Sequence, residues 1–311
     1  MIRIEKYNPQ KEKIWNEFIA TAKNSTFLFN RNYMDYHADR FTDNSLMFFK
    51  DETLIALLPA NLKNDILYSH QGLTYGGFII GFKARSSLML ELFEELINYL
   101  KSSQIKKFIY KPIPQFYNAI PSQEDLYALF RNNAQLFRRD VSSVINLKDK
   151  IQFNELRQRM IKKATAQNLE VKESKDFESF YKILQENLQT KHATCAVHSL
   201  EEITKLSQNF PENIKLYSCF KDGVILAATW IFINRRAIHL QYIASNEEGR
   251  KSGALDLIIN HLINEKYQDK NYFDFGISTE ENGKVLNEGL VNQKEMFGAR
   301  AYCCDHYSIE L

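Results

Sequence analysis

The second half of the chain alternates helices and strands in an order that limits the kind of sheet it can form. Apolar periodicity predicts a strand at 169–173, then two helices, three strands, a helix, a strand, a helix and a final strand. The later segments are predicted at 176–188, 199–208, 214–220, 224–233, 237–244, 253–267, 272–275, 284–296 and 301–311. Strands joined by short turns pair antiparallel, whereas a helical crossover allows parallel pairing. We therefore expect an α/β (α+β) fold with a mixed, largely antiparallel twisted sheet flanked by helices.

Local signals support these boundaries. Ser199 and Glu202 form a capping box that begins a helix. Asp222 and Gly223 are typical of a tight hairpin turn between two apolar strands. The apolar run at 224–233 has ten residues, about half of what a membrane-spanning helix needs, so it indicates a buried strand.

The first half follows a looser version of the same order. Strands are expected at 2–6, 46–49, 53–62 and 107–110, and helices at 10–22 and 86–100, with a further helix beginning at Ser122. A strand at 141–145 precedes a helix at 153–166. We expect two lobes of related pattern, residues 1–147 and 148–311.

Composition excludes several classes of protein. The chain has 11 Gly and 6 Pro in 311 residues, too few for collagen-like or Pro/Gly-rich disordered chains. Its 40 basic and 38 acidic residues argue against a general nucleic-acid or membrane-surface binder. The N-terminus has no apolar signal-peptide core, and the four cysteines show no C-x-x-C pair. A cytoplasmic location is expected.

The scarce glycines fall into two clusters. Gly72, Gly76, Gly77 and Gly81 lie in the first half, and six more lie between residues 249 and 298. Glycine is needed where φ is positive or where a backbone approaches another group closely. Turns account for any single glycine, but the clusters also suit places where a ligand meets the backbone.

Five stretches, in this order, resemble the GNAT acyltransferase superfamily, and more closely its tandem-GNAT branch, which includes the FemAB-type transferases. They are YSHQGLTYGG (68–77), IKKA (161–164), QYIA (241–244), YFDFGIS (272–278) and GLVNQKEMFG (289–298). The resemblance covers nearly the whole chain. It implies two GNAT-like lobes and an acyl-CoA cosubstrate.

In that family a strand, a glycine-rich turn and a helix N-terminus hold the pyrophosphate of coenzyme A, because unpaired N–H groups favour an anion. The segment GRKSGAL (249–255) follows a predicted strand, as the family pattern requires, but Leu255 stands where a small residue is usual. The resemblance implies a cofactor-binding set of Ala244, Ser245, Arg250, Lys251, Ser252, Gly253 and Ala254. An oxyanion contact from a strand bulge is expected near residues 243–245.

Acyl transfer needs an unprotonated nucleophile and a proton for the leaving group. Tyr242, Tyr272 and Ser278 are candidates for that proton by element order, although a packing or capping role is favoured for any one of them. His192 could act as a base. His192, Cys195 and His198 also suggest a metal, but helical spacings of three scatter them and no fourth ligand is visible, so no metal is predicted.

A basic belt runs from residue 131 to residue 163, with nine Lys or Arg against three acidic residues. It suits a phosphorylated partner as well as it suits a solvated helix face. The expected substrate-binding residues are His70, Tyr75, Gly76, Gly77, Lys162, His198 and Lys294.

The sequence therefore predicts an enzyme that transfers an acyl group from acyl-CoA to an amine of a sugar or cell-envelope precursor. A small-molecule acceptor is expected, and DNA is not. One alternative is a FemAB-type transferase that uses aminoacyl-tRNA; the absence of a sustained heptad run counts against it, since these proteins commonly carry a coiled coil. Another is a non-catalytic, glycan-binding GNAT-like module.

Overall fold

The structure is a computed structural model that describes residues 2–192 and 195–311, apart from the side chains of residues 191 and 192. The chain divides into two compact units. The first comprises Met1–Asp140, Glu280–Val285 and Cys303–Leu311, and the second comprises Val141–Thr279 and Leu286–Tyr302. The lobe boundary between residues 147 and 148 stays a prediction.

The first unit contains two sheets. In one, β1 (Ile2–Lys6), β3 (Leu46–Lys50), β4 (Thr53–Leu58) and β7 (Ile79–Ile80) pair antiparallel in that order. In the other, the order is β17 (Arg300–Glu310), β8 (Lys107–Tyr110), β6 (Ile66–Tyr68), β5 (Asn61–Lys63) and β2 (Thr42–Asp43), with only the β6–β8 pair parallel. Its helices are α1 (Glu12–Thr21), α2 (Arg31–Met34), α3 (Ser86–Ser102) and α4 (Glu124–Arg131).

Helix α3 packs into a core that the two sheets of this unit share. Its leucines recur every four residues, so Leu92, Leu96 and Leu100 share one face, and all three are buried. They belong to the same apolar cluster as Phe48 and Phe108 of the two sheets. The sequence predicted one strand at 53–62, but the chain breaks there into β4 and β5, which belong to different sheets.

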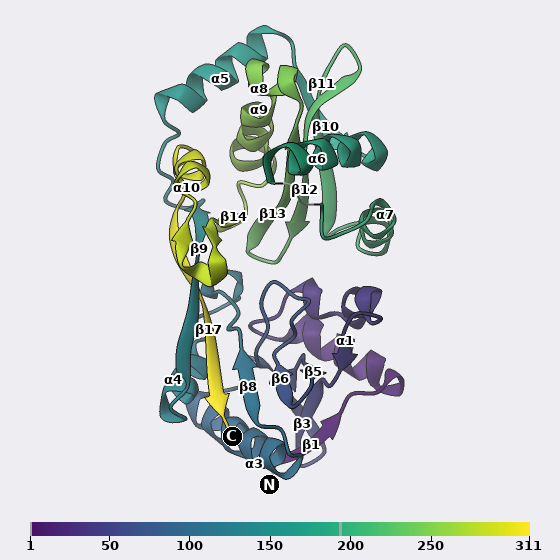
Figure 1. Ribbon diagram of the computed structural model, residues 1–311, viewed down its shortest axis with the longest axis vertical. Coiled ribbons are helices and arrows are strands. Elements are labelled where there is room, and N and C mark those ends of the chain that lie inside the picture. The colour runs from purple at the N-terminus through teal and green to yellow at the C-terminus, as the bar shows by residue number, and fades with distance from the viewer. Residues whose placement is uncertain (1, 193–194) are drawn as a thin grey trace. The chain divides into compact units, whose positions relative to one another are not determined.

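The second unit is built on one mixed sheet (Figure 1). Its order is β10 (Glu170–Ser174), β11 (Ile214–Lys221), β12 (Val224–Ile233), β13 (Ala237–Ser245), β14 (Tyr272–Ile277) and β9 (Gln135–Asn146). Only β13 and β14 pair parallel. The helices are α5 (Glu155–Ala166), α6 (Phe177–His192), α7 (Leu200–Asn209), α8 (Glu247–Ser252), α9 (Ala254–His261) and α10 (Glu288–Glu295). Two short strands, β15 (Thr279–Glu280) and β16 (Val285–Leu286), pair separately.

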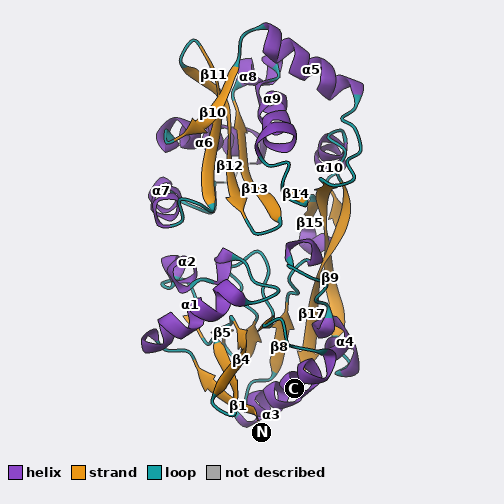
Figure 2. Ribbon diagram, turned by 180° about the vertical axis from the view of Figure 1, so that it is seen from behind, coloured by secondary structure: helices purple, strands orange, loops and turns teal. Residues whose placement is uncertain are grey.

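Helices cover both faces of this sheet. Figure 1 shows α6 in front of the strands, and Figure 2, from behind, shows α9 in front of them. The apolar run of β12 is buried from Ile225 to Phe232 because both of its faces meet helices. The Asp222-Gly223 hairpin and the Ser199–Glu202 capping box are both confirmed. The predicted fold class, mixed and largely antiparallel sheets flanked by helices, is confirmed as well.

Three segments differ from the sequence prediction. The glycine-rich turn after β13 is largely helical, because Asn246 caps α8 through the Gly249 N–H at 2.7 Å. The helix predicted at 253–267 ends as an α-helix at His261 and continues as a π-helical segment, Leu262–Lys266. The helix predicted from residue 284 begins at Glu288.

Candidate functional site

Strands β13 and β14 separate shortly after they begin to pair. Their parallel register covers three residue pairs, from Ala237–Tyr272 to His239–Asp274, although both strands continue beyond it. On its other side β13 carries a bulge, because Tyr242 lies opposite Trp230 whereas Leu240 lies opposite Ile231. Gln241 is thus the extra residue, two positions before the segment where the sequence predicted a bulge. A bulge removes a backbone group from the ladder and can redirect it toward a bound group.

A histidine–aspartate pair lies where the two strands part. His239 Nδ1 is 2.7 Å from Asp274 Oδ2, and both side chains are buried, with 11% and 5% of their surfaces exposed. The other carboxylate oxygen accepts hydrogen bonds from Ser142 Oγ at 2.6 Å and from the Gly276 N–H at 2.8 Å. Three donors therefore surround one carboxylate, which favours its ionised form.

This arrangement fixes how the imidazole presents its nitrogens. An ionised carboxylate only accepts, so His239 Nδ1 carries the proton, and Nε2 of the neutral ring has a free lone pair. Gly276 lies beside the ring: its φ of +75° favours glycine, and a Cβ there would be in ordinary contact with His239 Cε1 at 3.4 Å. A base with an orienting partner is the arrangement that proton abstraction from a nucleophile requires.

Lys294 fixes the end of β14 next to this pair. Its ammonium donates to the carbonyl oxygens of Gly276 and Ile277 and to Ser278 Oγ, each at 2.8 Å. Burial lowers the pKa of Lys294 to about 8, although the negative charge of Asp274 opposes the shift. All three protons of the ammonium are used, so Lys294 and Ser278 position the backbone around Gly276.

Tyr242 forms a second constellation with His198. The hydroxyl lies 2.8 Å from His198 Nδ1, and the tyrosine ring stacks on Trp230 at 5.9 Å between centroids and 11° between planes. Burial raises the pKa of Tyr242. Two residues that the sequence proposed for different roles are thus brought together.

The two constellations share one face of the sheet. Ile238, Leu240 and Phe273 belong to the core cluster that includes α9, so the alternating positions 239 and 274 face away from it. Ring contacts then lead from Tyr242 through Trp230 and Phe232 to His239, with centroids 5.9, 4.9 and 6.2 Å apart. A band of polar and aromatic side chains therefore runs along this face.

The α8–α9 junction, where the family pattern places a pyrophosphate, is occupied by the protein itself. Gly253 has φ +82°, and a Cβ on it would lie 2.5 Å from the Met160 carbonyl oxygen of α5. Asp256 lies in the first turn of α9 and pairs with Arg157 at 3.0 Å. A buried carboxylate already supplies negative charge at this helix N-terminus, and Leu255 packs against the core.

The polar groups of the junction are also engaged within the protein. Arg250 donates to the Ser245 carbonyl at 2.5 Å, Lys251 pairs with Glu247 at 2.6 Å, and Ser252 Oγ lies 3.3 Å from the Gly249 carbonyl. Ala244, Ser245 and Ala254 are buried. This turn therefore does not fit the pyrophosphate of coenzyme A as described.

Residues 152–282 match the family model described as an acetyltransferase (GNAT) domain. This segment is a GNAT domain. No curated protein matches its sequence.

Solved structures share the fold of the whole chain. They include FemX (TM-score 0.71, 10% identity, covering 99% of this chain and 97% of FemX) and L-PGS from Bacillus licheniformis (0.62, 12%, 97% and 91%). A tandem GNAT protein from the clavulanic acid biosynthesis pathway scores 0.51 at 8% identity, covering 100% and 98%. The GNAT domain supports acyl transfer in the general sense, a reaction class whose cosubstrate is generally an acyl-CoA.

The candidates in the first unit have internal structural roles. A Cβ at Gly76 would lie 1.9 Å from the Ser69 carbonyl oxygen, and a Cβ at Gly77 would lie 2.5 Å from the Tyr110 hydroxyl. Tyr75 donates to Thr26 Oγ1 at 3.2 Å. His70 is buried with φ 65°, and burial, together with the positive charges nearby, holds its pKa well below the usual value. Close packing, against the Ser69 backbone and the Tyr110 side chain, explains both glycines, and their role in substrate binding stays a prediction.

The remaining candidates are dispersed. Tyr272 begins β14, and its ring lies 6.4 Å from that of Tyr302. His192 ends α6, and its side chain lies outside the described residues. Within the described parts of the chain, no group of three His, Cys, Asp or Glu side chains could hold a metal. In those same parts, no helix is long and apolar enough to cross a membrane.

Sequence analysis missed His239 and proposed no role for Asp274. The available signal was Asp274 itself, a charged residue between two phenylalanines in a strand. A carboxylate in such a position is buried and needs a partner. Its partner, 35 residues earlier, could be identified only from the parallel register of β13 and β14.

Proposed function

We propose that this GNAT protein transfers an acyl group to an amine, with His239 as the general base. The observation that supports this most directly is the 2.7 Å contact between His239 Nδ1 and Asp274 Oδ2 at the point where β13 and β14 separate. The contact fixes the tautomer that leaves Nε2 able to accept a proton. Ser142 and Gly276 hold the carboxylate from its other side.

The proposed step is a balanced acyl transfer. The amine nitrogen attacks the acyl carbon, a C–N bond forms, and the bond from that carbon to the leaving atom of the donor breaks. His239 Nε2 takes the proton that the amine loses, and that proton departs with the leaving group. The Tyr242 hydroxyl, next to the bulge at Gln241, is the second group on this face that could deliver a proton.

The acceptor that we propose is an amine of a sugar or cell-envelope precursor, as the resemblance to FemAB-type proteins suggested. The shared fold with FemX and with L-PGS, a lysylphosphatidylglycerol synthetase, supports acyl or aminoacyl transfer in general.

For the donor, acyl-CoA is the first candidate because the chain has a GNAT domain. Aminoacyl-tRNA is the second, and the α8–α9 junction favours it. Asp256 and the Met160 carbonyl occupy the place where a pyrophosphate would bind, whereas a donor without a pyrophosphate does not need that place.

A transfer assay separates the two donors. Radiolabelled acetyl-CoA and radiolabelled aminoacyl-tRNA are each incubated with the full chain and a panel of amino sugars and peptidoglycan precursors. Transfer from one donor identifies it. Transfer from neither, to any acceptor, would contradict the enzymatic proposal and favour the glycan-binding module.

Two histidine variants test the base. We expect His239→Gln to lower kcat/KM by about a hundredfold or more. His261→Gln is the matched control, because His261 also contacts a carboxylate, Glu265 at 2.7 Å, but lies on α9. Equal activity in the two variants would refute the role of His239.

A further inference from the structure

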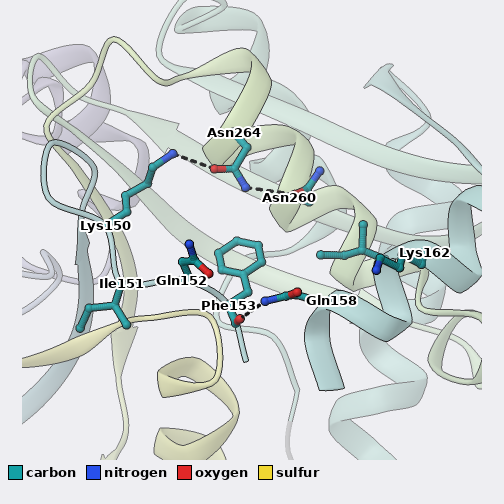
Figure 3. A pocket seen from close by; sticks show the side chains of 9 residues that line it. Lys150, Ile151, Gln152, Phe153, Gln158, Lys162, Asn260 and Asn264 are labelled. Atoms are coloured by element: carbon teal, nitrogen blue, oxygen red, sulfur yellow. Dashed lines mark hydrogen bonds between the residues drawn. The ribbon is translucent and has the colours of Figure 1, made fainter. Parts of the chain in front are cut away.

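A pocket lined by amide, lysine and apolar side chains lies in the second unit, away from the His239–Asp274 pair. It has a volume of about 540 Å³ and lies between the start of α5, the segment before it, and the end of α9 with the π-helical turn that follows. This volume is within the range of small-molecule sites. Figure 3 shows the Phe153 ring between Gln152 and Gln158, opposite the side chains of Asn260 and Asn264.

A chain of hydrogen bonds crosses one wall of the pocket with a fixed direction. Lys150 Nζ donates to Asn264 Oδ1 at 2.7 Å, Asn264 Nδ2 donates to Asn260 Oδ1 at 3.0 Å, and Asn260 Nδ2 donates to Glu265 Oε1 at 3.4 Å. Lysine can only donate and a carboxylate can only accept, so the orientation of both amides is set from the two ends. Each amide keeps a second proton and a second lone pair for a ligand.

The charge of the pocket is positive. Lys150 and Lys162 line it, and no carboxylate is among the lining residues. Lys162 is exposed on α5 and has no ion pair or hydrogen bond with any described residue. Its ammonium is therefore available to an anion.

The floor of the pocket is aromatic. Phe153 packs edge-on against Phe297, with 5.3 Å between centroids and 90° between planes, and is only partly buried. Gln158 Nε2 donates to the Phe153 carbonyl at 2.6 Å, which holds the start of α5 against it. A partly exposed ring that is held in place can stack on a planar ligand.

We propose that this pocket binds a nucleoside phosphate. The oriented amides of Asn260 and Asn264 suit the donor–acceptor edge of a base, Phe153 suits its face, and Lys162 suits the phosphate. The site does not depend on the proposed acyl transfer, since binding needs neither a donor nor an acceptor. The ligand could be a free nucleotide, the nucleotide part of coenzyme A or the 3′ end of an RNA.

Calorimetry on the full chain tests the site with ADP, adenosine and inorganic phosphate. We expect ADP to bind at least about tenfold more tightly than either fragment. Lys162→Gln should weaken ADP about tenfold and leave adenosine unchanged, and Asn264→Ala should weaken both. Lys205→Gln, at an exposed lysine on α7, is the matched control and should change nothing.

Competition identifies the source. Coenzyme A and a short RNA ending in adenosine are each tested for displacement of ADP, and whichever competes shares the site. The proposal is overturned if ADP does not bind at concentrations up to about 10 mM. It is also overturned if phosphate alone binds as tightly as ADP, or if neither variant differs from the Lys205→Gln control.

Discussion

Arg157 Nη1 lies 3.0 Å from Asp256 Oδ1, and this ion pair joins α5 to the first turn of α9. The two side chains are 15% and 9% exposed, and the guanidinium also lies 4.8 Å from the centre of the Phe297 ring. Burial raises the pKa of Asp256, and Arg157 opposes that shift. The helix N-terminus that would bind a pyrophosphate in the family pattern is therefore part of an internal packing contact.

Removal of Arg157 should destabilise the protein more than removal of a neighbouring exposed lysine. We expect Arg157→Met to lower the free energy of unfolding by about 3 kcal/mol, because it leaves Asp256 buried without its partner. Urea denaturation followed by circular dichroism measures this. Lys163→Met is the control: Lys163 is exposed, and its change should stay within about 0.5 kcal/mol. Similar losses in both variants would argue against the buried pair.

Two glycines share the same positive φ, so replacing each with alanine separates the cost of backbone strain from the cost of a steric clash. Gly253 and Gly223 both have φ +82°, but a Cβ at Gly253 would lie 2.5 Å from the Met160 carbonyl, whereas one at Gly223 meets nothing within 4 Å. We expect Gly223→Ala to cost about 1 kcal/mol and Gly253→Ala about 3 kcal/mol, because only the second forces α5 to move. Thermal denaturation of the two variants compares them, and equal costs would show that α5 is not packed against Gly253.

Asp274, whose carboxylate contacts His239, should matter more to activity than Ser142, which donates a hydrogen bond to that carboxylate. Asp274→Asn replaces an acceptor with a group that can present N–H to Nδ1, which favours the wrong tautomer, so we expect kcat/KM to fall about a hundredfold, as in His239→Gln. Ser142→Ala removes one of several donors to Asp274 and should cost about tenfold. Steady-state kinetics with the donor identified above provides the measurement. A Ser142→Ala loss as large as that of Asp274→Asn would contradict this ranking.

The sequence predicted elements better than it predicted partners. The Ser199 capping box and the Asp222-Gly223 turn depend on neighbours within four residues, so the local pattern was sufficient. Contacts such as His239–Asp274 join strands that are distant in sequence, and their register follows from the whole sheet. The sequence predicted a turn in place of helix α8, because Gly249 within the helix and Gly253 at its end mask the cap at Asn246. Gly253 is needed for its positive φ and for its contact with α5. Its position in the sequence could not distinguish these two roles from ligand binding.

Lys294 should make stability depend on pH above neutrality. Its pKa is about 8 in the folded protein, whereas an unperturbed lysine has a pKa of 10.5. Between these values the unfolded chain holds a proton that the folded chain has lost, so raising the pH favours folding. Across this interval the free energy of unfolding should rise by up to about 3 kcal/mol from this group. In Lys294→Met that contribution is absent, so the difference in the free energy of unfolding between wild type and variant should grow with pH.

Lys266→Met provides the reference for lysine titration in general, since Lys266 is exposed on the π-helical turn of the same unit. Its difference from wild type should be constant over the same range. Urea midpoints at several pH values between about 7.5 and 10 measure both differences. If the difference in urea midpoint between wild type and Lys294→Met stayed as independent of pH as that for Lys266→Met, the Lys294 ammonium would keep its charge on folding. The three oxygens around it would then offset the loss of water completely.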